Sequence, residues 1–419
     1  MTQHKLVVVG QGYVGLPIAM RAVETGFSVV GLDIDTVRVK ALQEGRSFVE
    51  DVSDADVAAA TASGAYVAST EITSLEGFGY VIITVPTPLK ETVPDLSFIE
   101  DSAASIAPYV TRGSTIVLES TTYPGTTEQL LVPALEEGSG LKAGTDFFVG
   151  YSPERIDPGN QTWTFVNTPK VLSGINAEST AKIIDLYERL VDTVVPVGSP
   201  KEAELTKLLE NTFRHVNIAL VNELAVFSHE LGINVWEAID AAATKPFGFM
   251  KFTPGPGVGG HCLPVDPSYL SWQVRRTLGQ NFRFVELAND VNDHMPDYVV
   301  RRVMAGLNEQ KKALNGSVVL VIGLSYKKNT GDPRESPAMR VTELLHDTGA
   351  TIRAVDPFVE GHLLADHLTL VDLTADQVAA ADAIVILTDH DNLDYDLIEA
   401  ADGYVLDTRH RLGGRRDTL

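Results

Sequence analysis

The strongest constraint on the fold is a glycine-rich run at residues 10–15, Gly-Gln-Gly-Tyr-Val-Gly, between an apolar stretch at 5–9 and a helical pattern. Glycines at this spacing permit a tight turn, close approach of the backbone to a pyrophosphate, and packing of the helix on the strand. The helix that begins there offers free N–H groups to phosphate oxygens. The segment therefore predicts a dinucleotide-binding βαβ unit at the start of the chain.

Asp33 follows the second expected strand of this unit, at 28–32. A carboxylate at that position accepts hydrogen bonds from the adenosine ribose and repels the 2′-phosphate of NADP. Asp33 therefore predicts NAD as the cofactor. The alternative is a glycine turn beside an ordinary aspartate at a strand end.

Two regions alternate short apolar segments, glycine turns and helical patterns, as parallel α/β sheets do. A mostly helical stretch separates them. We expect an α/β fold with two Rossmann-like, doubly wound parallel-sheet domains joined by a helical central domain. The expected domains are 1–198, 199–314 and 315–419. The expected strands are 5–9, 28–32, 80–85, 115–118 and 147–149, then 317–322, 351–355, 383–387 and 403–406.

A single long helix is expected to open the central domain. Ser-Pro-Lys-Glu at 199–202 combines a capping box with proline at the first helical position. Apolar residues then recur at helical spacing, and nothing breaks the pattern before Gly232. A helix of about 30 residues would be roughly 45 Å long, which suits a connector or a dimer interface.

The balance of charge excludes several classes of partner. The chain has 33 Lys and Arg against 56 Asp and Glu, a net charge of −23, which disfavours binding to nucleic acid or anionic membranes. No stretch approaches the roughly eighteen consecutive apolar residues of a membrane span. The start of the chain lacks a signal-peptide pattern, and a single cysteine favours a reducing, cytoplasmic location. No His, Cys and Asp cluster has metal-ligand spacing, so we predict no metal.

The only cysteine, Cys262, lies in the run Gly-Pro-Gly-Val-Gly-Gly-His-Cys-Leu-Pro-Val-Asp-Pro at 255–267. A free cysteine is usually a small buried hydrophobe. Here the glycines let the backbone come close to a ligand, which favours a chemical role. The neighbouring His261 is not expected to form a Cys–His pair, because adjacent side chains seldom face each other.

This run resembles the active-site signature of the UDP-sugar 6-dehydrogenases, the UDP-glucose/UDP-N-acetylmannosamine dehydrogenase family. These enzymes oxidise C6 of a UDP-hexose twice and form a uronic acid. Other motifs that resemble the family cover nearly the whole chain. They lie at 10–15, 85–88, 119–126, 151–155, 204–211, 323–327 and 331–337.

The resemblance implies a covalent mechanism, because the intermediate aldehyde must not escape between the two hydride transfers. A thiolate holds it as a thiohemiacetal, and the second oxidation leaves a thioester that water hydrolyses. Lys207 and Asn211, one helical turn apart, suit a developing oxyanion. The implied catalytic residues are Cys262 as nucleophile, Lys207 and Asn211 at the oxyanion, Asp266 with a Thr121-held water as proton relay, and Glu154 as the base for hydrolysis.

The resemblance also implies which residues bind the two small molecules, in a site between the two α/β halves with the long helix as its floor. The expected NAD contacts are Gly10, Gly12, Tyr13, Val14, Gly15, Asp33, Arg38, Thr87, Thr121 and Arg334. The expected UDP-sugar contacts are Glu154, Arg155, Lys207, Asn211, Arg214, Gly257, Gly260, His261, Tyr326 and Lys327. A homodimer through the long helix is expected as well.

The loops favour UDP-N-acetylglucosamine as the substrate. Glucose-specific enzymes usually read Gly-Gly-Ser-Cys-Phe-Pro-Lys-Asp, whereas here His261 replaces the serine and Val265 the lysine. The loops at 118–127, 151–160 and 244–250 look most like those of dehydrogenases acting on UDP-N-acetylglucosamine. UDP-N-acetylmannosamine and UDP-glucose are the alternative substrates.

Two other functions compete with this interpretation. A one-step hydroxyacid dehydrogenase would share the NAD domain and the long helix, but it needs neither a cysteine nucleophile nor a second α/β domain. An inactive UDP-sugar-binding protein is the other. Two NADH per sugar would distinguish the proposed enzyme from both.

Overall fold

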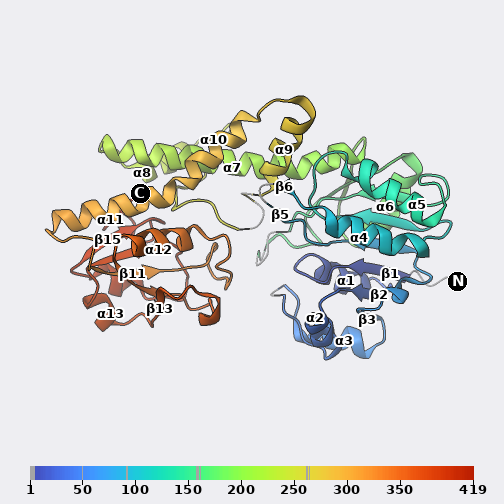
Figure 1. The fold of residues 1–419 in the computed structure, drawn as a ribbon, viewed down its shortest axis with the longest axis horizontal. Helices are drawn as coiled ribbons and strands as arrows, with labels where there is room; N and C mark the ends of the chain where they lie inside the picture. Colours follow the sequence, from blue (N-terminus) through green and yellow to red (C-terminus); the bar gives the residue numbers. More distant parts are fainter. Residues whose placement is uncertain are drawn as a thin grey trace. The chain divides into compact units, whose positions relative to one another are not determined.

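The computed structural model describes residues 5–49, 51–90, 93–156, 160, 162–260, 263 and 265–419. The chain forms two compact units, Met1–Glu210 and Asn211–Leu419. The division falls within the long helix α7 (Pro200–Glu230), which is drawn in green in Figure 1. Its bounds agree with the long helix expected from the sequence. The boundaries of the three expected domains stay a prediction.

The first unit is built on an eight-stranded sheet of order β10-β9-β8-β7-β4-β1-β2-β3. Its strands are β1 (Lys5–Val9), β2 (Ser28–Leu32), β3 (Tyr66–Ser69), β4 (Tyr80–Ile83), β7 (Thr115–Leu118), β8 (Phe148–Tyr151), β9 (Lys170–Gly174) and β10 (Val194–Pro196). Neighbouring strands run parallel except β8 and β9, which are antiparallel. The helices are α1 (Gly15–Glu24), α2 (Thr36–Gln43), α3 (Asp54–Ala62), α4 (Ser97–Ile106), α5 (Val132–Ser139) and α6 (Ala177–Tyr187), and β5 (Leu89–Lys90) pairs with β6 (Val93–Pro94) apart from the main sheet.

The central strands of this sheet form because their residues are apolar on both faces. Leu6, Val7 and Val8 of β1 are completely buried, as parallel strands covered on both faces require. The strands expected at 5–9, 28–32 and 115–118 have those bounds. Strands β3, β9 and β10 were not expected, because their sequences lack an uninterrupted apolar run. Strand β9, for example, begins with a buried lysine.

The second unit has a six-stranded, wholly parallel sheet of order β13-β12-β11-β14-β15-β16. The strands are β11 (Val318–Ile322), β12 (Thr351–Val355), β13 (Leu368–Leu370), β14 (Ala383–Ile386), β15 (Tyr404–Asp407) and β16 (Asp417–Thr418). Its helices, besides most of α7, are α8 (Val235–Ala243), α9 (Asp266–Leu278), α10 (Arg283–Asp293), α11 (Met295–Glu309), α12 (Pro337–Asp347), α13 (Ala375–Ala379) and α14 (Tyr395–Glu399). In Figure 1 the helices α11 and α12 lie next to each other, and both pack against this sheet.

These two sheets and the long helix confirm the expected fold class. In each sheet the order reverses next to the first strand, between β1 and β4 and between β11 and β14. Ligands of doubly wound sheets bind outside the carboxyl ends of the strands at such a reversal. The loops after these strands are therefore the expected location of a ligand site.

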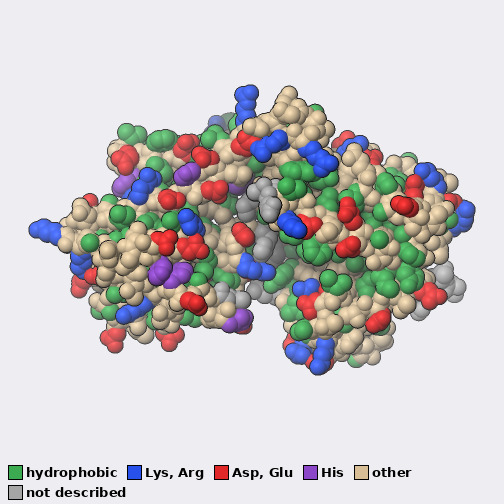
Figure 2. All heavy atoms as spheres, viewed as in Figure 1, with side chains coloured by type: hydrophobic (Ala, Val, Ile, Leu, Met, Phe, Trp, Pro, Cys, Tyr) green, Lys and Arg blue, Asp and Glu red, His purple; other side chains and the backbone are tan. Residues whose placement is uncertain are grey.

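Three further observations concern the surface charge, the helices and the side chains that could bind a metal. Figure 2 shows acidic and basic side chains interspersed on the face in view, with no large patch of one sign. None of the helices in the described part of the chain has both the length and the apolar character that crossing a membrane requires. Within the same residues, no three His, Cys, Asp or Glu side chains are grouped so that they could hold a metal ion.

Candidate active site

The glycine run after β1 forms the expected turn. Gly10 has φ +90°, and its N–H donates to the carbonyl of Leu32 at 2.8 Å. A Cβ on Gly15 would lie 1.9 Å from the Gly10 carbonyl oxygen, so only glycine fits where helix α1 meets the strand. A Cβ on Gly12 would meet nothing within 4 Å, and no side chain caps α1. The backbone there is thus open to a pyrophosphate, as NAD binding requires.

Asp33 and Arg38 lie beside this turn. The buried Asp33 accepts hydrogen bonds from the backbone N–H of Gln11 at 2.7 Å and from the Arg38 guanidinium at 2.9 Å. Its other oxygen accepts the backbone N–H of Asp35 at 2.9 Å. A carboxylate has about four acceptor sites, so Asp33 retains capacity for one ribose hydroxyl. Thr87 and Thr121 follow the neighbouring strands β4 and β7, whose carboxyl ends share this edge of the sheet.

A buried cluster of charged residues lies farther along the same edge. The Lys170 ammonium donates to Glu119 Oε2 at 2.6 Å and to Glu154 Oε2 at 3.3 Å. The hydroxyl of Tyr187 donates to the other oxygen of Glu119. All four side chains are buried. Of these four residues, only Glu154 was predicted from the sequence to be catalytic. No local sequence pattern singled out Lys170 or Tyr187.

Burial and charge act against each other on the pKa values of this cluster. Burial raises the pKa of Glu119 above its usual value, and the Lys170 ammonium offsets this only in part. Burial also opposes ionisation of Glu154, but the Lys170 ammonium, the Ile156 N–H and Lys207 outweigh it and lower the pKa. Glu154 is therefore a carboxylate at neutral pH. A buried ionised carboxylate can accept a proton from water.

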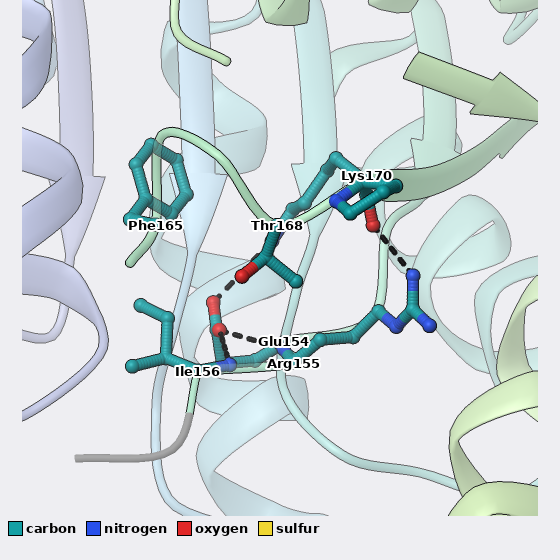
Figure 3. A pocket seen from close by; sticks show the side chains of 7 residues that line it. Glu154, Arg155, Ile156, Phe165, Thr168 and Lys170 are labelled. Atoms are coloured by element: carbon teal, nitrogen blue, oxygen red, sulfur yellow. Dashed lines mark hydrogen bonds and ion pairs between the residues drawn. The ribbon is translucent and has the colours of Figure 1, made fainter. Parts of the chain in front are cut away.

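Figure 3 shows Glu154, Arg155 and Lys170 around a small pocket that Phe165 also lines. The Arg155 guanidinium extends away from Glu154 to the carbonyl of Pro169, at 2.5 Å, and pairs with Glu210 at 2.7 Å. Arg155 was expected to contact the UDP-sugar. In this structure its guanidinium joins the strand-end loop to helix α7, and its contact with the UDP-sugar stays a prediction.

Helix α7 carries Lys207 and Asn211 one turn apart. Lys207 is 9% exposed and acts electrostatically on Glu154. Asn211 Nδ2 donates to Oδ2 of Asp266 at 2.6 Å, and Asp266 opens helix α9. Arg214, another expected substrate contact, is exposed on the same helix. The structure thus brings Lys207 near Glu154 and Asn211 against Asp266.

The glycine-rich loop packs against the loop after β11. A Cβ on Gly260, which has φ +88°, would lie 2.9 Å from the Tyr326 ring. Gly257, with φ +134°, likewise leaves no room for a side chain beside Pro337. These contacts place Tyr326 next to the glycines of the loop. Cys262 and His261 lie outside the described residues.

The loop that carries Tyr326 and Lys327 is held by a network that sequence reasoning missed. Asp356, at the end of β12, accepts the N–H groups of Leu324 and Ser325 at 2.8 and 3.1 Å. His390 contacts Asp356 at 3.0 Å. The sequence did contain a signal for this network. Gly323 and Asp356 follow the consecutive strands β11 and β12, just as Gly10 and Asp33 follow β1 and β2. Arg334, expected to reach NAD, forms a two-bond ion pair with Asp332.

Comparisons with known proteins agree with this arrangement. Models of the UDP-glucose/GDP-mannose dehydrogenase family match along most of the chain: the NAD binding domain at 4–191, the central domain at 201–294 and the UDP binding domain at 320–413. The chain is 36% identical to a UDP-N-acetyl-D-mannosamine dehydrogenase of Pyrococcus horikoshii, over 92% of this chain and 89% of that one.

Two further similarities bear on the substrate and the fold. A UDP-N-acetyl-D-glucosamine 6-dehydrogenase of Pseudomonas aeruginosa is 35% identical over 93% of this chain and 91% of its own. The solved structure of a UDP-D-ManNAc dehydrogenase from Pyrococcus horikoshii superimposes with a TM-score of 0.87 at 33% identity, covering 96% of this chain and 94% of that one. The names of these relatives thus differ in the sugar, N-acetylmannosamine in one and N-acetylglucosamine in the other.

Proposed function

The chain belongs to the UDP-glucose/GDP-mannose dehydrogenase family and carries its NAD binding domain, and from this premise we propose that it oxidises C6 of UDP-N-acetylglucosamine to the carboxylate in two NAD-dependent steps. The observation that carries the proposal is the hydrogen bond between Asn211 and Asp266, one helical turn beyond Lys207. This hydrogen bond supports a shared role for Lys207, Asn211 and Asp266, which the sequence assigns to the same reaction.

In the first oxidation, NAD held by the glycine turn after β1 and by Asp33 would supply the hydride acceptor for C6. Lys207 and Asp266 take part in removing the hydroxyl proton, with a water held by Thr121. Asn211, whose amide donates to Asp266, then holds that carboxylate in place. The ammonium of Lys207 and the amide of Asn211 favour negative charge on the C6 oxygen as it develops.

Cys262 then adds to the aldehyde through its thiolate and forms a thiohemiacetal, which the second oxidation converts to a thioester. Glu154 accepts a proton from the water that attacks the thioester carbon. The products of this last step are the uronic acid and the free thiol. A thiol nucleophile of this kind fits the reducing cytoplasm, which we propose as the location.

UDP-N-acetylglucosamine is proposed over its 2-epimer, UDP-N-acetylmannosamine. The reason is that the loops at 118–127, 151–160 and 244–250 look most like those of enzymes that act on UDP-N-acetylglucosamine. The Pseudomonas aeruginosa relative with that substrate in its name supports the choice. UDP-N-acetylmannosamine is the second candidate, favoured by the name of the Pyrococcus horikoshii relative. The two substrates differ at one stereocentre.

The test is NADH formation with UDP-N-acetylglucosamine, UDP-N-acetylmannosamine, UDP-N-acetylgalactosamine and UDP-glucose under identical conditions. The proposal expects the highest kcat/KM with the first and two NADH per sugar. Higher activity with another UDP-sugar would refute the proposed substrate but not the proposed mechanism. One NADH per sugar, with activity retained in Cys262→Ala, would refute the mechanism. UDP binding without any turnover would favour an inactive binding protein.

We also propose a homodimer that forms along α7. Its apolar side chains Leu220, Leu224 and Phe227 are 44–56% exposed, which is unusual for large apolar residues on one helix. The second copy of the chain is the proposed partner. Light scattering should give twice the mass of the chain, and Leu220→Asp with Phe227→Asp should give the monomer mass. A monomeric parent chain would refute the dimer.

A further inference from the structure

The buried cluster around Lys170 is formed by the strand register at the edge of the first sheet. Strands β8 and β9 are antiparallel, with Gly150 opposite Gly174 and Tyr151 opposite Ser173. The same register, extended past the end of β8, sets Glu154 opposite Lys170. Glu119 follows the adjacent strand β7. Three chain segments therefore deliver their charged side chains to one buried point.

Both oxygens of Glu154 are held in fixed positions. Oε2 lies 3.3 Å from the Lys170 ammonium, while Oε1 accepts the backbone N–H groups of Arg155 and Ile156. A carboxylate restrained at both oxygens cannot rotate freely. The lysine is itself restrained, because its shorter bond, at 2.6 Å, is to Glu119.

The charges in the cluster depend on one another. Glu119 and Glu154 share the Lys170 ammonium, Tyr187 donates to Glu119, and the charge of Lys207 on α7 also lowers the pKa of Glu154. Two buried carboxylates near one cation cannot both be ionised without cost. Burial raises the pKa of Glu119, whereas that of Glu154 is lowered, so Glu154 is the first of the two carboxyls to ionise as the pH rises.

We propose that Lys170 and Glu119 are positioning residues for thioester hydrolysis: Lys170 keeps Glu154 ionised and oriented, and Glu119 anchors Lys170. This inference rests on the proposed function, in which Glu154 is the base. Neither residue touches the substrate. Their effect reaches the reaction only through the orientation and the protonation of Glu154.

The two residues should have different effects on the pH profile of kcat. Lys170→Met removes the cation that favours ionised Glu154, so the acid limb of the profile should move to higher pH. Glu119→Gln replaces a carboxyl that still carries its proton where Glu154 titrates, so the acid limb should stay in place. A general loss of stability would not move the acid limb in one variant and leave it unchanged in the other.

The experiment combines this profile with mass spectrometry of the enzyme–substrate thioester, trapped by rapid acid quench during turnover with a UDP-sugar that the assay above shows to be active. Glu154→Gln is the reference variant and should accumulate the thioester. Lys170→Met should also accumulate it and lower kcat by about 100-fold at neutral pH, since a general base contributes about 10²–10⁴-fold. Lys170→Arg should restore part of the loss.

Arg302→Met is the matched control. It also removes a buried cation, one paired with Asp417 at the far end of the chain, and it should leave both readouts unchanged. If Lys170→Met does not fold, Lys170→Gln, which also lacks the cation but keeps a hydrogen-bond donor, decides the question through the shift of its acid limb.

The outcomes separate this inference from the proposed function. No thioester in Glu154→Gln, with normal turnover, would refute the role of Glu154 itself. Accumulation in Glu154→Gln but wild-type hydrolysis in Lys170→Met would refute only the positioning role. No shift of the acid limb in Lys170→Met, or an equal shift in Glu119→Gln, would also overturn it.

Discussion

Glu204 accepts hydrogen bonds from both the backbone N–H and the hydroxyl of Thr127, at 2.9 and 2.7 Å. Its second oxygen accepts the N–H of Gly125. Glu204 is completely buried and lies in α7, one turn before Lys207. One carboxylate therefore fastens the loop after β7, where Thr121 lies, to the helix that supplies Lys207.

Replacing Glu204 by alanine should weaken this connection. Glu204→Ala would leave the N–H groups of Gly125 and Thr127 without their acceptor, and a buried group left without a partner costs about 1–3 kcal/mol. Urea denaturation at pH 5 should show a loss of stability of at least that size. Glu137→Ala, on an exposed position of α5, is the control and should change stability little. Equal effects of the two substitutions would contradict the prediction.

The same carboxyl should make stability depend on pH. Burial raises the pKa of Glu204 to about 7 from the usual 4.5, despite the donors that favour its ionised form. Because the pKa in the folded state is the higher one, its contribution is fully present below pH 4.5 and is lost as pH rises to 7. The parent chain should therefore lose about 3 kcal/mol relative to Glu204→Gln over this range. A stability difference that stays constant from pH 4.5 to 8 would be inconsistent with this assignment.

Two glycines of the first turn should respond differently to alanine. Gly15→Ala places a Cβ 1.9 Å from the Gly10 carbonyl oxygen, so it should lower the thermal midpoint of the first unit by several degrees. Gly12→Ala meets nothing within 4 Å, so stability should hold while NAD affinity falls at least tenfold. Calorimetry measures both quantities for each variant. Unchanged NAD affinity in Gly12→Ala would argue against pyrophosphate binding at this turn.

His390 should control binding of the uridine nucleotide. Its Nδ1 accepts the N–H of Asn329 at 2.9 Å and its Nε2 contacts Asp356, so it holds both ends of the loop that carries Lys327. His390→Ala should weaken UDP binding about tenfold, or about 1.4 kcal/mol, by titration calorimetry and leave NAD affinity unchanged. The exposed His362→Ala is the control. Equal losses of UDP and NAD affinity would point to general unfolding instead.

The features foreseen from sequence are those whose residues lie close together in the chain. The turn at 10–15, the strand before it and Asp33 form one local unit, and the structure confirms that unit. The long helix was also foreseen, because its capping residues and apolar spacing are local signals. Strand β9 was missed, since its run from Lys170 to Gly174 has no apolar pattern and is defined by pairing with β8.

The sequence by itself therefore determined the fold class, the cofactor and, through its motifs, the family, because each depends on short-range patterns of glycine, apolar and acidic residues. Only the tertiary structure decided the surroundings of Glu154. Its partner Lys170 comes from a different strand and Tyr187 from a helix, and their meeting depends on strand order and register. Burial then decides which of two similar carboxyls ionises, and burial is a property of packing that no local sequence pattern encodes.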